Sequence, residues 1–192
     1  MTVLHNPLEL PANLPAPVDD GAARHLVGMA WPDLALSASD GTAVNLAGGR
    51  GRVIIYAYPR TGRPGEALPT GWDAIPGARG CTPQSCGFRD HFAELSGLGV
   101  SALYGLSTQT RADQSEVATR LHLPFALLSD ARLELQVALR LPTFSVDGMT
   151  LLKRLTLLLD DGVISKVFYP VFPPDRSAAE VIAWLKGPMD AP

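Results

Sequence analysis

The sequence predicts an α/β fold in which helices pack on both faces of a central sheet. The clearest strand covers residues 53–58, where the run Val-Ile-Ile-Tyr-Ala-Tyr is apolar on both faces, as in a central strand covered from each side. An amphipathic helix begins near Cys81, and its apolar residues Phe88, Phe92 and Leu95 recur at helical spacing. Short strands and helices then alternate over short links, which is typical of α/β proteins.

The elements before the central strand are predicted to be irregular at first and then β-structured. Residues 1–27 contain prolines at positions 7, 11, 15 and 17, which disfavour regular structure, so we expect an extension that docks on the domain, with one helical turn over residues 21–26. Residues 31–46 are predicted to form two short strands. The turn between them is Asp40-Gly41, a strong signal for a tight hairpin.

The elements after the first helix continue the alternation. Residues 100–107 are predicted to form a strand. Thr110 and Asp113 have the spacing of a helix N-terminal cap, which predicts a helix that ends near His122. A short strand over 125–128 follows.

Two helices and a hairpin complete the predicted domain. The first of these helices is expected to be capped by Ser129 or Asp130, and its predicted inner face consists of Leu133, Val137 and Leu141. Residues 151–159 and 163–169 are predicted to pair as a hairpin around Asp160-Asp161-Gly162. The last helix is predicted over 175–186, with Gly187-Pro188 as its stop and an inner face of Val181, Trp184 and Leu185.

Composition excludes several functional classes. A chain of 192 residues with 46% hydrophobic and 18% charged residues describes one soluble globular domain. The net charge of −3 offers no basic excess for nucleic acid or an anionic membrane, and no apolar run approaches the roughly 20 residues of a membrane span. Two cysteines are too few for a secreted disulfide scaffold, and the first residues lack the pattern of a signal peptide. We therefore expect a cytoplasmic protein.

The two cysteines, Cys81 and Cys86, lie at the start of the predicted helix. Pro83 is tolerated only in a first turn, because its missing N–H would have no intrahelical partner there. Cys81 is therefore expected at the helix N-terminus, where unpaired backbone N–H groups and the helix dipole stabilise a thiolate, the reactive form of cysteine. Two buried inert cysteines, or half of a metal site, are the alternatives, although a zinc site lacks further ligands at customary spacing.

The spacing of the two cysteines favours a reaction cycle over a permanent disulfide. In an intact helix, five residues separate the Cα atoms by roughly 8.6 Å, whereas a disulfide needs about 7 Å or less. The first turns must therefore unwind before the two sulfurs join. In such a cycle Cys81 reacts first, and Cys86 traps the oxidised product after local melting.

Three segments resemble one known family. The motif Cys-Thr-Pro-x-x-Cys-Gly-Phe-Arg-Asp at 81–90 resembles the active-site segment of the Q-type peroxiredoxins, also called bacterioferritin co-migratory proteins. Tyr58-Pro59 resembles the Tyr-Pro that ends the family's core strand, and residues 123–130 are similar to its Leu-Pro-Phe-x-Leu-Leu-Ser-Asp. The resemblance covers residues 28–186. It implies a thioredoxin-like fold with a central mixed sheet, flanking helices and an N-terminal hairpin, and it adds Pro59 to the candidate site.

The predicted domain organisation follows from this resemblance and from one departure from it. We expect an extension over 1–27, a peroxiredoxin domain over 28–187 and a tail over 188–192. Within the domain, 21 residues at 60–80 separate Tyr-Pro from Cys81, where the family has only a few. We call this segment the insertion loop.

The insertion loop also changes the expected site. The family has a threonine three positions before the reactive cysteine, where this chain has Ala78, and its hydroxyl is thought to hydrogen-bond the thiolate and the peroxide. The loss of such a donor weakens transition-state stabilisation. Thr61, or otherwise Thr70, is the candidate to replace it. The loop arginines that could face the thiolate are Arg60, Arg63 and Arg79, with a solvated surface position as the alternative.

A further candidate cation lies near the C-terminal hairpin. Arg154-x-Thr156 resembles the family's Arg-x-Thr-Phe, whose arginine faces the peroxidatic sulfur. A cation beside Cys81 favours the thiolate and holds the peroxide. A shift of one residue in register would place Lys153 there instead.

The resemblance implies a thiol peroxidase. Peroxidatic Cys81 would reduce hydrogen peroxide and organic hydroperoxides, resolving Cys86 would form a disulfide with it, and a thioredoxin-like dithiol donor would reduce that disulfide. No cofactor is expected, because sulfur carries the redox change. The family is often monomeric, so a monomer is expected. A redox sensor and a low-activity thiol–disulfide oxidoreductase are the alternative functions.

Overall fold

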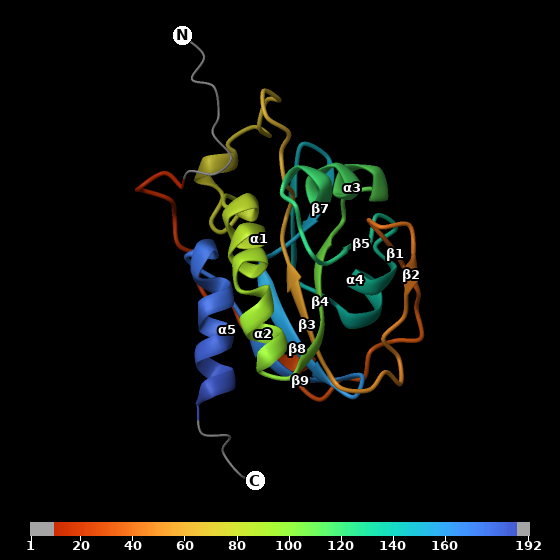
Figure 1. Cartoon of the computed structure of the whole chain (residues 1–192). Helices are drawn as coiled ribbons and strands as arrows, with labels where there is room; N and C mark the ends of the chain where they lie inside the picture. The colour runs from red at the N-terminus through yellow and green to blue at the C-terminus, as the bar shows by residue number, and fades with distance from the viewer. Residues whose placement is uncertain (1–9, 188–192) are drawn as a thin grey trace.

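The computed structural model of the chain describes residues 10–187, which are built around one seven-stranded mixed sheet with helices on both faces (Figure 1). In spatial order its strands are β2 (Ala43–Val44), β1 (Leu36–Ala38), β5 (Leu127–Ser129), β4 (Val100–Ser107), β3 (Arg52–Ala57), β8 (Leu155–Asp160) and β9 (Val163–Phe168). Strands β3, β4 and β5 run parallel, and the other neighbours are antiparallel. The predicted α/β class with a mixed central sheet is confirmed.

The helices form two layers because the central strand β3 is apolar on both faces. The helices are α1 (Cys81–Asp90), α2 (Phe92–Gly97), α3 (Arg111–Arg120), α4 (Glu134–Leu139) and α5 (Ser177–Lys186), with 3-10 turns η1 (Arg24–Leu26), η2 (Trp72–Ala74) and η3 (Pro174–Arg176). Ile54 and Tyr56 pack with residues of α1, α2, α3 and α5, whereas Ile55 and Ala57 pack with α4 and η1. Helices α1 and α5 lie side by side on one side of the sheet (Figure 1).

The predicted amino-terminal hairpin is confirmed. Strands β1 and β2 pair antiparallel, with Leu36 opposite Val44. Asp40 closes the turn, since its carboxylate accepts hydrogen bonds from the backbone N–H and the hydroxyl of Thr42. Gly41 adopts a φ of 91°, a left-handed conformation that glycine adopts at little cost.

The predicted C-terminal hairpin is correct in its turn but wrong in its first strand. Strands β8 and β9 pair around Asp161-Gly162, as expected. The expected continuous strand 151–159 is instead divided, because β7 (Met149–Leu152) pairs with β6 (Thr143–Val146) in a separate two-stranded sheet. Lys153 and Arg154 link β7 to β8. At this link the chain passes from the two-stranded sheet to the main sheet, and the side chain of Arg154 is buried.

The predicted inner face of the helix after Asp130 is wrong at Val137, which is 68% exposed. Asp130 does provide the expected cap, since its carboxylate accepts hydrogen bonds from the N–H groups of Leu135 and Gln136. The chain makes a left-handed turn at Leu133, with a φ of 59°, before α4 begins. This turn rotates the helix so that Leu135 and Leu139 face the core.

Two other helical predictions need correction. The helix expected to continue from Phe88 through Leu95 is divided at His91, between α1 and α2, although Phe88 and Leu95 are both buried as predicted. In α5, Ile182 is buried while Trp184 is 39% exposed. The Trp184 ring packs at its edge against Phe168 and therefore does not enter the core.

The described part of the predicted extension docks on the domain. Ala23 and Leu26 are buried in the core, and η1 corresponds to the expected helical turn. The carboxylate of Asp20 accepts hydrogen bonds from Lys153 and Tyr169, at 2.7 and 2.8 Å. Residues 1–9 and the tail 188–192 lie outside the described residues, and the domain boundaries stay a prediction.

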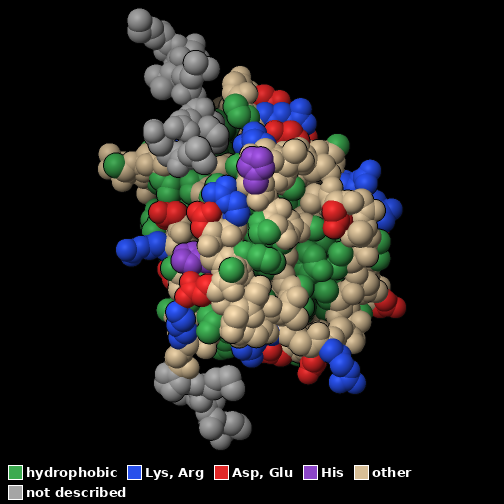
Figure 2. Space-filling model, in the orientation of Figure 1, with side chains coloured by type: hydrophobic (Ala, Val, Ile, Leu, Met, Phe, Trp, Pro, Cys, Tyr) green, Lys and Arg blue, Asp and Glu red, His purple; other side chains and the backbone are tan. Residues whose placement is uncertain are grey.

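The visible surface mixes charges of both signs, with acidic and basic side chains interspersed (Figure 2). Across residues 10–187, no helix is both long and apolar enough to cross a membrane.

Candidate active site

Cys81 is the first residue of α1, as the position of Pro83 predicts. Gly80 precedes it with a φ of 100°, and a Cβ atom at Gly80 would lie 2.3 Å from Cγ of Pro174. Both the conformation and the lack of space therefore require glycine at this position. The Cys81 side chain is 4% exposed, and its thiol donates to the backbone oxygen of Ala78 at 3.6 Å.

Arg154 contacts the sulfur of Cys81 from inside the protein. Its Nη2 atom lies 3.3 Å from Sγ of Cys81, so the structure brings together two residues that are 73 positions apart in the chain. The same nitrogen lies within hydrogen-bonding distance of three successive carbonyl oxygens of the insertion loop, those of Gly77, Ala78 and Arg79. Nη1 donates to Oε1 of Gln84. The carbonyls and this amide orient the guanidinium toward the sulfur.

The charge of Arg154 has no carboxylate partner among residues 10–187. The side chain is 3% exposed, and an isolated charge is costly to bury. The neighbouring oxygens belong to neutral amide groups, so among the described residues that contact Arg154 the sulfur of Cys81 is the group that can become an anion. Lys153, the alternative in register, forms an ion pair with Asp20 instead.

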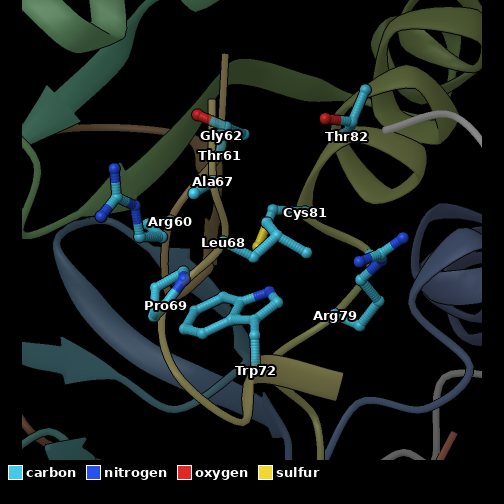
Figure 3. Close-up of a pocket in the computed structure, with 11 residues that line it drawn as sticks. Arg60, Thr61, Gly62, Ala67, Leu68, Pro69, Trp72, Arg79, Cys81 and Thr82 are labelled. Atoms are coloured by element: carbon cyan, nitrogen blue, oxygen red, sulfur yellow. The ribbon is translucent and has the colours of Figure 1, made fainter. Parts of the chain in front are cut away.

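A small pocket gives access to Cys81 (Figure 3). Thr82 and Cys81 of α1 form one side, and the insertion loop contributes Leu68, Pro69 and Trp72 on the other. Figure 3 shows the sulfur of Cys81 on the side where Leu68 and Trp72 lie. The reactive atom is thus reached through a space between α1 and the insertion loop.

Of the two hydroxyl candidates, the structure places Thr61 in this pocket but not Thr70. Thr61 is 3% exposed, and both its backbone N–H and its hydroxyl donate to Oε1 of Gln109, at 2.8 and 3.2 Å. Gln109 donates back to the carbonyl oxygen of Thr61. Thr70 bonds through its backbone to Asp147. Pro59 is buried just after β3 but is not among the residues that line the pocket.

The three loop arginines occupy different positions. Arg60 and Arg79 line the pocket of Cys81, and Arg79 also forms an ion pair with Asp73 at 2.8 Å. Arg63 forms an exposed ion pair with Asp113, and Nη1 of Arg60 contacts Sδ of Met149. In Figure 3 the guanidinium groups of Arg60 and Arg79 are directed away from the sulfur of Cys81.

Cys86 lies on the same uninterrupted helix and is half-buried. Both cysteines are free thiols. Burial raises the pKa of Cys86, and the nearby positive charge of Arg89 opposes that shift. Because α1 is continuous from Cys81 to Asp90, the helical geometry that separates the two sulfurs is present, as the spacing predicts.

Polar side chains that sequence reasoning missed hold the first turns of α1 in place. Gln84 donates from Nε2 to the hydroxyl of Ser177 on α5 at 3.3 Å. Tyr56 on β3 donates to the hydroxyl of Ser85 at 3.1 Å, and its ring stacks on Phe88 with centroids 4.5 Å apart. A sequence signal existed for Gln84, since positions three apart on a helix share a face, and Gln84 is three residues after Cys81.

Comparisons with known proteins agree with this geometry. The family model described as Redoxin matches residues 26–182. The chain is 35% identical over 162 residues to "Peroxiredoxin Bcp" of Escherichia coli, which covers 81% of this chain and 92% of that protein. It is 31% identical to "Peroxiredoxin Q, chloroplastic" of Oryza sativa subsp. japonica over 161 residues, or 83% of this chain. The chain spans only 66% of the length of that rice protein.

A solved structure with a similar fold is that of peroxidoxin BcpB from Mycobacterium tuberculosis. It has a TM-score of 0.64 and 25% sequence identity, and covers 83% of this chain and 95% of that one. Together with the matched family model and the Escherichia coli relative, it supports one assignment. This chain belongs to the Redoxin family, in the peroxiredoxin Q and Bcp group.

Proposed function

We propose that this chain is a thiol peroxidase in which Cys81 is the peroxidatic residue. The observation that carries the proposal is the buried guanidinium of Arg154, 3.3 Å from the sulfur of Cys81 and without a carboxylate partner among the described residues. An adjacent cation and a helix N-terminus both stabilise a thiolate. Membership of the peroxiredoxin family supports the same chemistry.

The first step transfers one oxygen atom from the peroxide to sulfur. The Cys81 thiolate attacks the distal oxygen of a hydroperoxide, an S–O bond forms and the O–O bond breaks. The alkoxide or hydroxide that leaves takes up a proton, so the products are an alcohol or water and the sulfenic acid of Cys81. Arg154 is placed to stabilise negative charge as it moves from sulfur to oxygen.

We propose that Thr61, which lines the pocket with Cys81, contacts the peroxide. Its hydroxyl hydrogen is directed to Gln109, so its oxygen is free to accept a hydrogen bond from a peroxide O–H group. To donate to the sulfur or the peroxide, as in the family's pattern, this hydroxyl must leave Gln109. With its hydroxyl hydrogen directed to Gln109, Thr61 would accept a hydrogen bond from the peroxide and so help to orient it.

The second step joins the two cysteines after α1 opens. The thiol of Cys86 condenses with the sulfenic acid, which forms the disulfide and releases water. The first turns of α1 must unwind for this step, so the bonds from Tyr56 to Ser85 and from Gln84 to Ser177 are released. A thioredoxin-like dithiol then reduces the disulfide and is itself oxidised.

The cellular setting of the enzyme is part of the proposal. We expect a monomer in the cytoplasm that takes electrons from a thioredoxin-like protein. Named relatives include both a bacterial protein and chloroplastic proteins.

One observation favours a slower redox sensor as the second candidate. Ala78, at the position of the family's threonine, offers the sulfur no hydroxyl, and the hydroxyl of Thr61 is bonded to Gln109. A site with fewer donors at the developing charge reacts more slowly.

A single-turnover thiol titration tests the proposed function. Reduced protein is mixed with one equivalent of hydrogen peroxide, and free thiols are counted with time. We expect the wild-type protein to lose both thiols, the Cys86→Ser variant to give a Cys81 sulfenic acid that dimedone traps, and the Cys81→Ser variant to keep its thiol. Steady-state turnover with a thioredoxin system then separates an enzyme from a sensor, which oxidises once without turnover. Survival of both thiols in the wild-type protein contradicts the proposal.

A further inference from the structure

The insertion loop forms one wall of the Cys81 pocket through apolar side chains. Leu68, Pro69 and Trp72 line the pocket opposite α1. In Figure 3 the Trp72 indole lies beside Pro69, below Leu68 and Cys81 in this view. Apart from the indole N–H, these side chains have no hydrogen-bonding groups. An incoming peroxide therefore meets an apolar surface, which acts on a substrate chiefly through its shape.

This wall is a packed part of the fold. Trp72 is 4% exposed and belongs to a small core of its own with Ala78 and Leu151, against which Phe144 packs. The rings of Trp72 and Phe144 have centroids 6.2 Å apart. Because Trp72 is buried against the separate β6–β7 hairpin, its side chain moves only if that packing is disrupted.

A hydrogen bond and an ion pair hold the insertion loop on either side of Trp72. The backbone N–H of Thr70 donates to the carboxylate of Asp147, at 2.9 Å, in the turn between β6 and β7. Arg79 forms an ion pair with Asp73 at 2.8 Å, and the Arg79 side chain is 11% exposed. The indole is therefore anchored both by apolar packing and by its neighbours in sequence.

The space that this wall leaves beside Cys81 is small. The volume open to the centre of a water-sized sphere is about 20 Å³, and one water needs roughly 10–15 Å³ by the same measure. Hydrogen peroxide is only slightly larger than water, so it fits beside the sulfur. The body of a bulky organic hydroperoxide is larger than this volume, so it must press against the loop side chains that line the pocket. A larger cavity of about 330 Å³ lies near Arg154, but Cys81 is not among its lining residues.

We infer that Trp72, with Leu68, sets the substrate preference of this protein toward hydrogen peroxide and against bulky organic hydroperoxides. The inference rests on the proposed peroxidase function. A bulky peroxide that approaches Cys81 presses on the indole, which can move only if its packing against Phe144 is disrupted. The energy of that displacement raises the activation barrier for the bulky peroxide but not the barrier for hydrogen peroxide. The residues that discriminate belong to the insertion loop of this chain.

The test compares two peroxides in a single turnover, which removes any dependence on the electron donor. Reduced protein reacts with hydrogen peroxide or with cumene hydroperoxide, and second-order rate constants are taken from the loss of free thiols. We expect the wild-type protein to favour hydrogen peroxide at least about tenfold, and the Trp72→Ala variant to reduce that ratio by about tenfold or more, the scale of discrimination that pocket shape provides. The Leu68→Ala variant should shift the ratio in the same direction.

The matched control is Trp184→Ala, which removes a tryptophan that is 39% exposed on α5 and outside the pocket. It should leave the ratio unchanged. If Trp72→Ala loses its fold by circular dichroism, Leu68→Ala and Trp72→Phe decide the question, because each removes less of the packed core.

The outcomes separate the two claims. A wild-type protein that reacts with neither peroxide contradicts the proposed function itself. A wild-type protein that reacts equally fast with both peroxides leaves the peroxidase function standing and overturns the inference. Folded pocket variants that keep the wild-type ratio overturn it as well.

Discussion

Replacing Arg154 with methionine is the sharpest test of how the site acts on sulfur. Methionine keeps an unbranched apolar side chain but removes the positive charge and the donors at Cys81. At 3.3 Å and an effective dielectric constant of about 20, the attraction between a guanidinium and a thiolate is about 5 kcal/mol, which sets an upper limit. The loss of one preorganised donor typically costs a factor of about 100 to 1,000 in rate. We expect the oxidation of Cys81 to slow by that factor.

The same substitution should also destabilise the fold. The carbonyl oxygens of Gly77, Ala78 and Arg79 and the amide oxygen of Gln84 lose their common donor. A buried acceptor left without a hydrogen-bond donor costs about 1–3 kcal/mol, so a lower melting temperature is expected. Rates must therefore be measured where circular dichroism shows a folded variant.

The assay is the single-turnover oxidation of Cys81 by hydrogen peroxide, followed across pH. Arg154→Lys should fall between the wild-type protein and Arg154→Met, because an ammonium keeps the charge but cannot match the geometry of the guanidinium fork. Lys153→Met is the matched control, because Lys153 is the adjacent residue on the same link and its ion pair is on the surface. A folded Arg154→Met variant whose rate stays within about threefold of the wild-type rate, a small fraction of the loss expected for one donor, refutes the role assigned to Arg154.

Three further predictions concern titration and packing. In a Cys81→Ser variant, Cys86 should be alkylated with a pH midpoint above its ordinary value of 9.0, because burial raises its pKa. The contribution of the neutral Cys86 thiol to the stability of the folded protein is present below pH 9.0 and is lost as the pH rises through the pKa of the folded state. A midpoint at or below 9.0 contradicts this prediction. Phe88→Ala should destabilise the protein by about 3–5 kcal/mol in chemical denaturation, because the ring is fully buried against Tyr56, and a loss under about 1 kcal/mol would count against that packing. Hydrogen bonds from Lys153 and Tyr169 lower the pKa of the Asp20 carboxyl, so its contribution to stability is present above pH 3.8 and is lost only at more acidic pH; an NMR titration that places its midpoint at 3.8 or higher would show that these bonds do not form in solution.

Local patterns carried much of the prediction. The apolar run at 53–58 indicated a strand covered on both faces, because such a run is costly anywhere else. The structure buries residues 54–58 fully and Val53 partly. Pro83 indicated the start of α1 because proline restricts helices in a way that does not depend on the rest of the fold. Asp40-Gly41 indicated a hairpin turn for the same kind of reason.

The errors arose where local periodicity competed with long-range packing. In α4, Val137 continued an apolar pattern, but the left-handed turn at Leu133 rotated the helix and exposed it. Residues 151–159 looked like one strand because both β7 and β8 are apolar. The break between them depends on which partner each strand pairs with. Strand β7 pairs with β6 in the small second sheet, whereas β8 pairs with β3, which is about 100 residues earlier in the chain.

The sequence by itself determined that a cysteine stands at a helix start, that a second one lies five positions later, and that this motif resembles the peroxiredoxin Q group. These are short-range properties, and chain stereochemistry and helix geometry are enough to define them. Only the tertiary structure decided that Arg154 rather than Lys153 contacts the sulfur, and that Thr61 and Trp72, but not Thr70, line the pocket. Each of these depends on contacts between segments far apart in the chain, where the direction of a side chain follows from the packing of the whole domain.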